Sequence, residues 1–392
     1  MAKKGNNEGS IYKDSQGRWR GVVTLPSAEG KVKKKYFYGK SKKEVSEKVN
    51  ALLNEMKNNT YIEPCKTTLY NWLCTWLETY CQNNIRPTTY VNYETYIHRH
   101  IKDSIGSIKL CDLSTIAKQQ FYNEKLKNGK LSGAGGLSPK TMKNLHNMLH
   151  KALNQAVCLN MITKNPSDFT VIPKNIKKEM RFFTVEEQRK LQAILTAKTL
   201  DMAILLDLYT GLRKGELLGL KWENVHIDLS GDSYIKVVQT INRIKNYDAD
   251  NDKKTVLTVS EPKTSNSKRT IPILPEIAQK LYNYRLSQEK YIAENTLPHT
   301  EYVFISSVGT IVDPRDFQRY FKNLLKKHDI REINVHGLRH TFATRALESG
   351  MSVKTLSKIL GHSNVWFTLD TYTHVTEDLM SEAISNMGDF LK

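Results

Sequence analysis

The sequence predicts three domains: a small α+β domain over residues 1–58, an all-helical bundle over 66–172, and a mixed, mainly helical domain with a small antiparallel sheet over 180–392. At 392 residues the chain is too long for one ordinary domain. Strand-like alternation appears at the N-terminus and again from Tyr234, whereas apolar residues elsewhere recur at helical spacing. The polar, basic stretch Ile172–Glu179 has the composition of a linker between the second and third domains.

The first domain is predicted to be three strands backed by one helix. Turn signals at Asp14–Gly17 and Ser27–Gly30 separate the strand-like runs, which are Ser10–Tyr12, Trp19–Leu25 and Val32–Tyr38. Ser41 is a suitable N-cap for the helix that follows. The apolar face of this helix consists of Val45, Val49, Leu52 and Leu53.

This first domain is strongly basic, with fourteen Lys and Arg residues against six Asp and Glu residues. Arg18, Arg20, Lys33 and Lys35 alternate with apolar residues, so we expect one face of the sheet to be basic. For any single one of these residues a solvated surface is an equally good interpretation. Their clustering favours contact with DNA.

The second domain is predicted to be helical throughout. Helices are expected over Thr67–Tyr80, from Pro87, over Ser114–Leu126 and from Pro139. The last helix carries a core-facing stripe of Met142, Leu145, Leu149, Leu153, Ala156 and Val157. The loop Gly129–Gly136 is rich in glycine but lacks the Gly-Lys-Ser/Thr signature of a phosphate-binding loop, so we do not expect nucleotide binding.

The first helix of the third domain is predicted to follow Thr184, which has the form of an N-cap with Glu187 as its capping-box acid. Tyr234–Ile244 and Thr255–Val259 are predicted to be paired strands, with Arg269–Leu274 as a third. Helices are then expected through Ser349. The tail 377–392 has an apolar helical stripe, which packs either on its own domain or on a neighbouring protomer.

Composition narrows the class of partner. A formal net charge of +19 favours a polyanion, and nucleic acid fits better than a membrane surface because the chain has no basic amphipathic anchor. The N-terminus lacks a secretory signal and no apolar run is long enough to cross a membrane, so a cytoplasmic protein is expected. The cysteines are odd in number and show no CxxC spacing, which argues against a zinc site or disulfide framework.

Arg213 is the first candidate for chemistry. It follows Gly211, which should end the apolar helix Leu200–Tyr209, and it precedes a second helix that starts at Lys214. An arginine at such a junction is held on both sides, and its planar donors match two phosphate oxygens. Glu216, one turn later, is placed to orient or neutralise Arg213. Taken alone, the pattern also fits a surface arginine.

His336 and Arg339 are three residues apart and share a helix face. Arg339 would supply a second clamp on a phosphate, and His336 can donate a hydrogen bond or move a proton near neutral pH. His340 stands four residues after His336, as zinc ligands do. However, Gly337 occupies the place where the metalloprotease motif requires Glu, so a metal site is not expected.

His362 and Tyr372 complete the candidates near the C-terminus. His362 follows Gly361, which should stop a helix over Val353–Leu360 that Ser352 caps. Tyr372 is the candidate nucleophile. Tyrosine, with a pKa near 10, attacks well only an electrophilic phosphate, and two arginines create one by stabilising charge in the transition state. Packing roles are the alternative for both residues.

Lys263 lies in a predicted turn between two strands. A lysine inserted beside a breaking phosphodiester can give the leaving 5′-hydroxyl its proton. Lys268 and Arg269 are near neighbours, so position alone does not single out Lys263, and a solvated turn is the competing interpretation.

Together these motifs resemble the tyrosine recombinase (phage integrase) family in order and spacing across roughly residues 180–380. The matching segments are Thr210–Glu216, Pro262–Thr264, His336–Thr341, Leu360–His362 and Tyr372–His374. The resemblance implies that Tyr372 attacks a scissile phosphate. It places around that phosphate Arg213, Lys263, His336, Arg339 and His362.

The rest of the chain is similar to integrases of temperate phages and conjugative transposons, and which of the two origins applies stays open. The similarity implies an arm-type DNA-binding domain over 1–58, a SAM-like core-binding domain over 66–172 and a catalytic domain over 180–392. It also implies integration and excision of a mobile element through a 3′-phosphotyrosyl intermediate, with no metal or other cofactor. The implied partners are double-stranded DNA attachment sites, three further protomers in a homotetramer, and an excisionase or host DNA-bending protein. The implied location is the bacterial cytoplasm, on the nucleoid when bound to DNA.

Two alternatives of other classes remain. A non-catalytic DNA-binding regulator with the same fold predicts the loss of site residues, yet all are present. A type IB topoisomerase-like enzyme, which relaxes DNA without recombining it, needs neither an arm-binding domain nor a tetramer.

Overall fold

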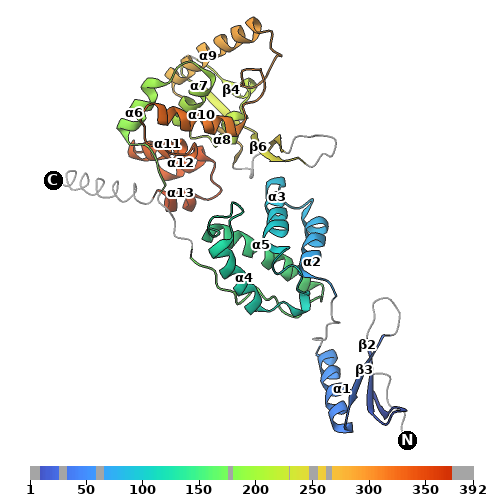
Figure 1. Ribbon diagram of the computed structural model, residues 1–392. Helices are drawn as coiled ribbons and strands as arrows, with labels where there is room; N and C mark the ends of the chain where they lie inside the picture. Colours follow the sequence, from blue (N-terminus) through green and yellow to red (C-terminus); the bar gives the residue numbers. More distant parts are fainter. Residues whose placement is uncertain are drawn as a thin grey trace, which may run out of the picture. The chain divides into compact units, whose positions relative to one another are not determined.

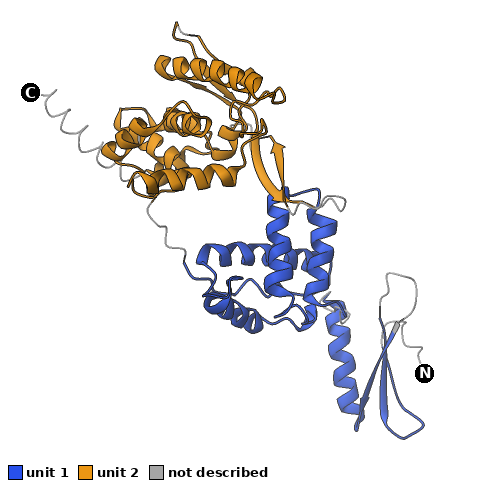
Figure 2. Ribbon diagram, turned by 45° about the horizontal axis from the view of Figure 1, so that its top comes forward, with its two compact units in different colours: residues 1–176 blue, residues 177–392 orange. Residues whose placement is uncertain are grey.

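The structure is a computed structural model that describes residues 9–25, 33–58, 66–174, 180–228, 230–246, 255–261 and 267–372. The chain forms two compact units, residues 1–176 and 177–392 (Figure 2). The predicted fold class is confirmed: a small α+β region and a helical bundle precede a mainly helical unit that contains small antiparallel sheets.

The N-terminal part of the first unit is a small antiparallel sheet with one helix against it (Figure 1). Among residues 9–58, the described elements are β1 (Ser10–Lys13), β2 (Trp19–Leu25), β3 (Lys33–Gly39) and α1 (Lys42–Lys57). The Ser41 side chain caps α1 by accepting from the Glu44 backbone N–H, as predicted. The buried core between sheet and helix consists of Val23, Leu25, Val45, Val49 and Leu52.

The strand register corrects the expectation of one basic face. Arg20 pairs with Tyr12 and with Tyr38, which places these three residues in one row on the face away from α1. Lys35 pairs with Val23, so it lies on the other face, beside the core. Because side chains alternate between faces, Arg20 and Lys35 lie on different surfaces and do not form one basic face. Arg18 precedes β2, and Lys33 pairs with Leu25 at the start of β3.

The second part of the first unit is a helical bundle. Its described α-helices are α2 (Leu69–Trp76), α3 (Pro87–Thr95), α4 (Thr115–Asn128) and α5 (Pro139–Cys158). α2 continues as the π-helix η1 (Leu77–Cys81), and α3 continues as the π-helix η2 (Tyr96–Ile101). A 3₁₀ turn, η3 (Leu110–Asp112), precedes α4. Ser114 and Ser138 cap α4 and α5. Five of the six stripe residues predicted for α5 are fully buried, and Val157 is partly buried.

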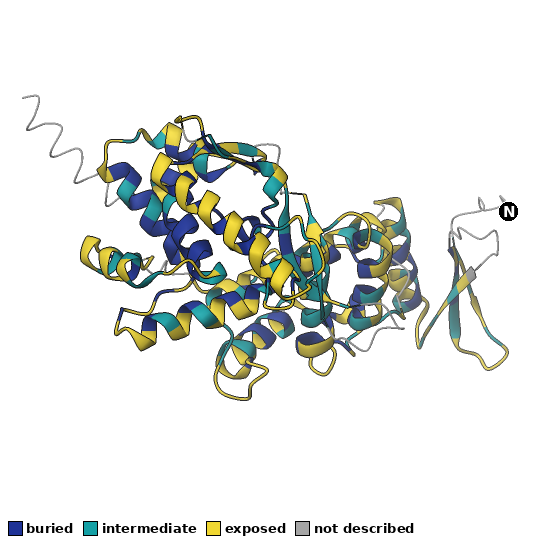
Figure 3. Ribbon diagram, turned by 90° about the horizontal axis from the view of Figure 1, so that it is seen from above, coloured by how far each residue is buried: buried dark blue, intermediate teal, exposed yellow. Residues whose placement is uncertain are grey.

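The second unit is built around α7, in which every residue from Asp201 to Leu208 is buried. Figure 3 colours the described chain by burial. The helices of this unit are α6 (Val185–Ile194), α7 (Thr199–Thr210), α8 (Lys214–Leu218), the 3₁₀ turn η4 (Trp222–Asn224), α9 (Pro275–Glu294), α10 (Pro314–Lys327), α11 (His336–Glu348), α12 (Val353–Leu360) and α13 (Val365–Thr371). Thr184 and Glu187 form the predicted capping box at α6. No helix among the described residues is long and apolar enough to cross a membrane.

The strands of this unit differ from the prediction in two respects: a short strand at Val225–His226 was not expected, and one expected strand is divided. The stretch expected as one strand from Tyr234 is two, β5 (Tyr234–Val237) and β6 (Thr240–Lys245), and they belong to different sheets. β5 pairs with β4 (Val225–His226) and with β8 (Arg269–Pro272), whereas β6 pairs with β7 (Thr255–Ser260). The break lies at Val238–Gln239, where the Gln239 side chain donates to the Gly219 carbonyl oxygen at 2.7 Å.

Candidate active site

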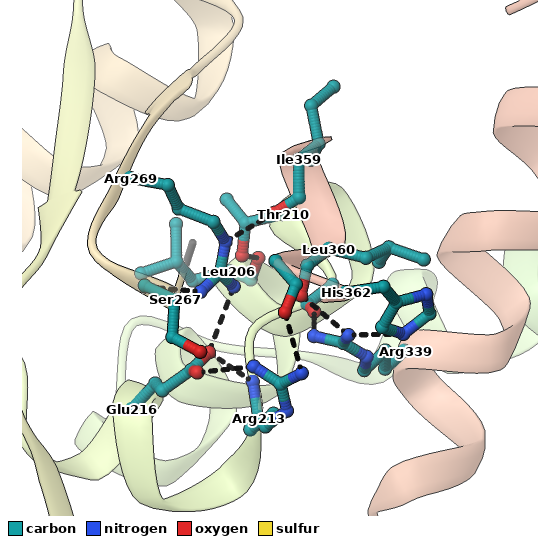
Figure 4. Close-up of polar contacts among 12 residues, drawn as sticks. Leu206, Thr210, Arg213, Glu216, Ser267, Arg269, Arg339, Ile359, Leu360 and His362 are labelled. Atoms are coloured by element: carbon teal, nitrogen blue, oxygen red, sulfur yellow. Dashed lines mark hydrogen bonds and ion pairs between the residues drawn. The ribbon is translucent and has the colours of Figure 1, made fainter. Parts of the chain in front are cut away.

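Arg213 lies at the junction between α7 and α8. Gly211 ends α7 in the left-handed conformation, with φ of 59°, which a residue without Cβ adopts at no steric cost. The Arg213 guanidinium donates to Glu216 Oε1 at 2.8 Å and to the Gly361 carbonyl oxygen at 3.0 Å (Figure 4). These two contacts fix the direction of the Arg213 side chain. The side chain is 38% exposed, so it still faces solvent.

Glu216 is a buried carboxylate shared by two arginines. Its Oε2 accepts from the Arg213 backbone N–H at 3.0 Å and from Arg269 Nη2 at 2.9 Å, while Oε1 holds the Arg213 side chain. Burial alone would raise the pKa of Glu216, but Arg269 and then Arg213 outweigh it and hold this pKa below its usual value. Sequence reasoning treated Arg269 only as a neighbour of Lys263, and its place in this network was missed.

Arg339 is 2% exposed and is surrounded by main-chain acceptors. It donates to the Gly211 carbonyl oxygen at 2.7 Å and to the Leu360 carbonyl oxygen at 2.6 Å (Figure 4). Burial, followed by the charge of Arg213, lowers the pKa of Arg339 to about 9. At neutral pH the group is therefore a fixed positive charge at the junction of α7, α11 and α12.

His362 is held in one tautomer. Arg339 Nη2 lies 2.9 Å from His362 Nε2, and Thr368 Oγ1 lies 2.7 Å from His362 Nδ1. A guanidinium only donates, so Nε2 accepts and the proton is on Nδ1, which donates to Thr368. Burial, followed by the charge of Arg339, lowers the pKa of His362 to about 3, and the ring is neutral near pH 7.

Tyr372 follows α13 directly and is 3% exposed. Its hydroxyl lies 2.7 Å from His340 Nδ1, and the His340 ring in turn meets the His336 ring edge to face at 4.6 Å between centroids. Burial raises the pKa of Tyr372, and Arg339 offsets part of that rise. Burial, followed by His336, lowers the pKa of His340 to about 3. Sequence reasoning considered His340 only as a metal ligand and missed this contact.

The structure brings five of the six predicted catalytic residues into one region, together with Glu216. Arg213, Arg339 and His362 are joined by hydrogen bonds through the Gly211 and Gly361 turns, and Tyr372 reaches His336 through His340. Lys263 lies outside the described residues, as do His374 and the tail 377–392.

This arrangement is suited to an anion. Two guanidinium groups and a neutral imidazole are fixed by contacts made before any ligand arrives, and such preorganised donors stabilise developing negative charge. Among the described residues, no group of three His, Cys, Asp or Glu side chains is placed to hold a metal ion.

Comparisons with known proteins fit this geometry. The sequence profile of the phage integrase family matches residues 181–378, and that of the phage integrase N-terminal SAM-like domain matches residues 68–126. A protein of Caldanaerobacter subterraneus subsp. tengcongensis named tyrosine recombinase XerC-like is 33% identical over 402 residues, which cover 99% of each chain. The transposase from transposon Tn916 of Enterococcus faecalis is 26% identical over 327 residues, which cover 76% of this chain and 73% of that relative.

Solved structures share the fold. The Tn1549 transposon integrase in complex with transposon right end DNA matches with a TM-score of 0.65 at 23% identity, covering 82% of this chain and 100% of that one. A lambda integrase tetramer bound to a Holliday junction matches with a TM-score of 0.56 at 20% identity, covering 90% of this chain and 95% of that one.

Proposed function

Because the chain belongs to the phage integrase family of tyrosine recombinases, we propose that Tyr372 attacks a DNA phosphodiester held in the site described above. The protein is a site-specific recombinase, a DNA strand transferase that acts as the integrase of a mobile element. The residues that we place around the scissile phosphate are Arg213, Lys263, His336, Arg339 and His362, with Glu216 in support. Arg339 contacts His362 directly, and Arg213 is tied to the same place through the Gly361 carbonyl oxygen; this convergence carries the assignment.

Each residue has a role that follows from its surroundings. Arg213, with its side chain 38% exposed, and His336, which is exposed, meet the phosphate oxygens first. Arg339 contributes a buried positive charge behind them, where the medium screens it little. Tyr372 forms the new bond to phosphorus and yields a 3′-phosphotyrosyl link, and the leaving 5′-hydroxyl takes a proton from Lys263.

The exchange needs no external energy source. A phosphodiester is converted into a phosphotyrosyl ester of similar energy, and the 5′-hydroxyl of a partner duplex then attacks that link. The arginines supply the positive charge that Mg²⁺ supplies in other phosphoryl-transfer sites.

Attack requires Tyr372 to leave its buried position. α13, which precedes Tyr372, buries Thr368 and leaves Trp366 72% exposed and Phe367 60% exposed. A short helix with so little buried apolar surface is inexpensive to displace. DNA binding therefore shifts α13 and brings the hydroxyl to the phosphate.

The remaining domains position this chemistry on DNA. Residues 1–58 bind arm-type sites, residues 66–172 bind the core site, and residues 180–392 cut and rejoin the strands. The partners in this proposal are double-stranded attachment sites, a homotetramer on synapsed duplexes, and an excisionase or a host DNA-bending protein. The work takes place in the bacterial cytoplasm, on the nucleoid.

The test is a nicked duplex that carries an attachment site read from the DNA flanking the gene. The wild-type protein should become covalently trapped on this suicide substrate, whereas Tyr372→Phe should bind it equally well and trap nothing. An adduct formed by Tyr372→Phe would show that the nucleophile is a different residue.

Two other outcomes would contradict the proposed function. Relaxation of a supercoiled plasmid without strand exchange between two sites would favour a type IB topoisomerase-like enzyme. The absence of any wild-type adduct would favour a non-catalytic regulator.

A further inference from the structure

Arg269 is a third arginine in the candidate active site. It is the first residue of β8, and its side chain is 6% exposed. An arginine so deeply buried must have its charge and its donors satisfied by the protein, because an unpaired guanidinium in that position would destabilise the fold. Its partners therefore show what the residue holds in place.

Those partners belong to three separate segments. Nη2 pairs with Glu216 Oε2 at 2.9 Å, Nε donates to the Ile359 carbonyl oxygen, and Nη1 donates to the Ser267 carbonyl oxygen at 3.1 Å (Figure 4). One planar group thus joins α8, the end of α12 and the turn before β8.

Two of these contacts also support Arg213. Glu216 holds Arg213 through both carboxylate oxygens, and Arg269 is the group that contributes most to keeping Glu216 ionised. The Arg269 guanidinium also packs against Gly361, where an added Cβ would stand 2.9 Å from Arg269 Nη1. The Gly361 carbonyl oxygen is the second acceptor of the Arg213 side chain, and His362 is the next residue.

From these contacts we infer that Arg269 is a positioning residue that sets the geometry of Arg213 and His362 through Glu216 and the Gly361 turn. It lies six residues after Lys263 in the sequence, and it also donates to the backbone of Ser267. This inference rests on the proposed function. It assigns Arg269 no contact with DNA.

The experiment measures single-turnover adduct formation on the nicked attachment-site duplex at saturating DNA, with DNA affinity and melting temperature measured in parallel. Arg269→Met should slow adduct formation about 100-fold, and Arg269→Lys about tenfold, because lysine keeps the charge beside Glu216 and loses the planar fork. DNA affinity should change less than about threefold in both, since Arg269 does not meet the DNA. Lys268→Met is the matched control: Lys268 pairs with Glu261 at the surface, and its variant should behave as the wild type.

A double-mutant cycle separates positioning from general loss of stability. If Arg269 acts in part through Glu216, the double variant Glu216→Gln/Arg269→Met should be at least about threefold faster than the product of the two single losses predicts. Losses that multiply, or an Arg269→Lys rate within twofold of the wild type, would overturn the inference. Should Arg269→Met fail to fold, the Lys variant decides alone. The two failures are distinguishable: the proposed function fails if the wild type forms no adduct or Tyr372→Phe forms one, whereas the inference on Arg269 fails on the relative rates of variants that still form the adduct.

Discussion

The arginines of the N-terminal sheet and those of the candidate active site are held by different kinds of partner. Arg20 lies 4.1 Å above the ring of Tyr36, and its buried Nε has no hydrogen-bond partner among the described residues. Arg339 instead donates to two main-chain carbonyl groups within 2.7 Å. An aromatic face attracts a guanidinium but leaves its donors available and its position adjustable, whereas carbonyl acceptors use the donors and fix the position. The first arrangement suits recognition of a variable partner, and the second suits a charge that must not move.

The strongest test of this comparison is a substitution of Arg339. Arg339→Lys should slow adduct formation on the nicked duplex at least about 100-fold, because one ammonium cannot reach the Gly211 and Leu360 carbonyls and His362 together. It should also lower the free energy of unfolding by about 1–3 kcal/mol, since buried acceptors lose their partners. Arg319→Lys, at an arginine whose side chain is 74% exposed on α10, is the control and should leave both quantities unchanged. An Arg339→Lys rate within threefold of the wild type would contradict the comparison.

His340 tests whether its contact at 2.7 Å holds the Tyr372 hydroxyl in the buried position that the hydroxyl must leave before attack. We expect His340→Gln to speed adduct formation on the nicked duplex about tenfold, because its amide reaches the place of Nε2 and leaves the buried hydroxyl without its partner. His340→Asn, whose amide lies near the place of Nδ1, should stay closer to the wild-type rate. The two isosteres are compared by single-turnover trapping at saturating DNA. Equal rates in both, or a slower His340→Gln, would mean that this contact does not hold the hydroxyl in its resting position.

A substitution of Arg20 tests whether the arginine of the N-terminal sheet serves DNA binding and not the stability of the fold. Arg20→Lys keeps the charge but loses stacking over Tyr36, and it should weaken binding to arm-type DNA about tenfold with little change in melting temperature. Cleavage of a duplex that contains only the core site should proceed at the wild-type rate. Filter binding or fluorescence anisotropy at fixed salt measures the first quantity. A large loss of stability in Arg20→Lys would show that this arginine, too, is structural.

The free energy of unfolding of an Asp207 variant tests whether the buried charge of Arg339 needs a carboxylate near it. This carboxylate on α7 is buried, both of its oxygens lack hydrogen-bond partners among the described residues, and burial raises its pKa well above 3.8 despite the attraction of Arg339. For an acid with a raised folded pKa, stability is lost as pH rises above the unfolded value. Asp207→Asn should therefore increase the free energy of unfolding by about 1 kcal/mol at pH 7.5, and by less at pH 4.5. Urea unfolding at both pH values checks this, and a destabilised variant at pH 7.5 would show that Asp207 is a needed counter-charge for Arg339.

The sequence predicted best what is determined locally. Helix caps at Ser41, Thr184 and Ser352, and the buried stripe of α5, depend on residues within one or two turns of each other. The split of the strand from Tyr234 was missed because β5 and β6 share one alternating pattern and differ only in their distant partners.

The same reason explains the gaps in the predicted site. The contact of Arg269 with Glu216 spans 53 residues and that of His340 with Tyr372 spans 32, and no local pattern encodes either. Motif spacing nevertheless selected Arg213, Arg339 and His362, which the fold joins by hydrogen bonds. The role of Lys263 and the domain boundaries stay predictions.

The acceptors of Arg213 and Arg339 at Gly361 and Gly211 have a consequence for how this protein tolerates mutation. A main-chain carbonyl cannot be deleted by exchanging a side chain, so random variation leaves these partners in place. Both residues, however, adopt a left-handed backbone, and an added Cβ would stand 2.5 Å from Phe342 at position 211 and 2.9 Å from Arg269 at position 361. Inactivating alleles should therefore accumulate at two positions that have no side chain, next to residues that carry the chemistry.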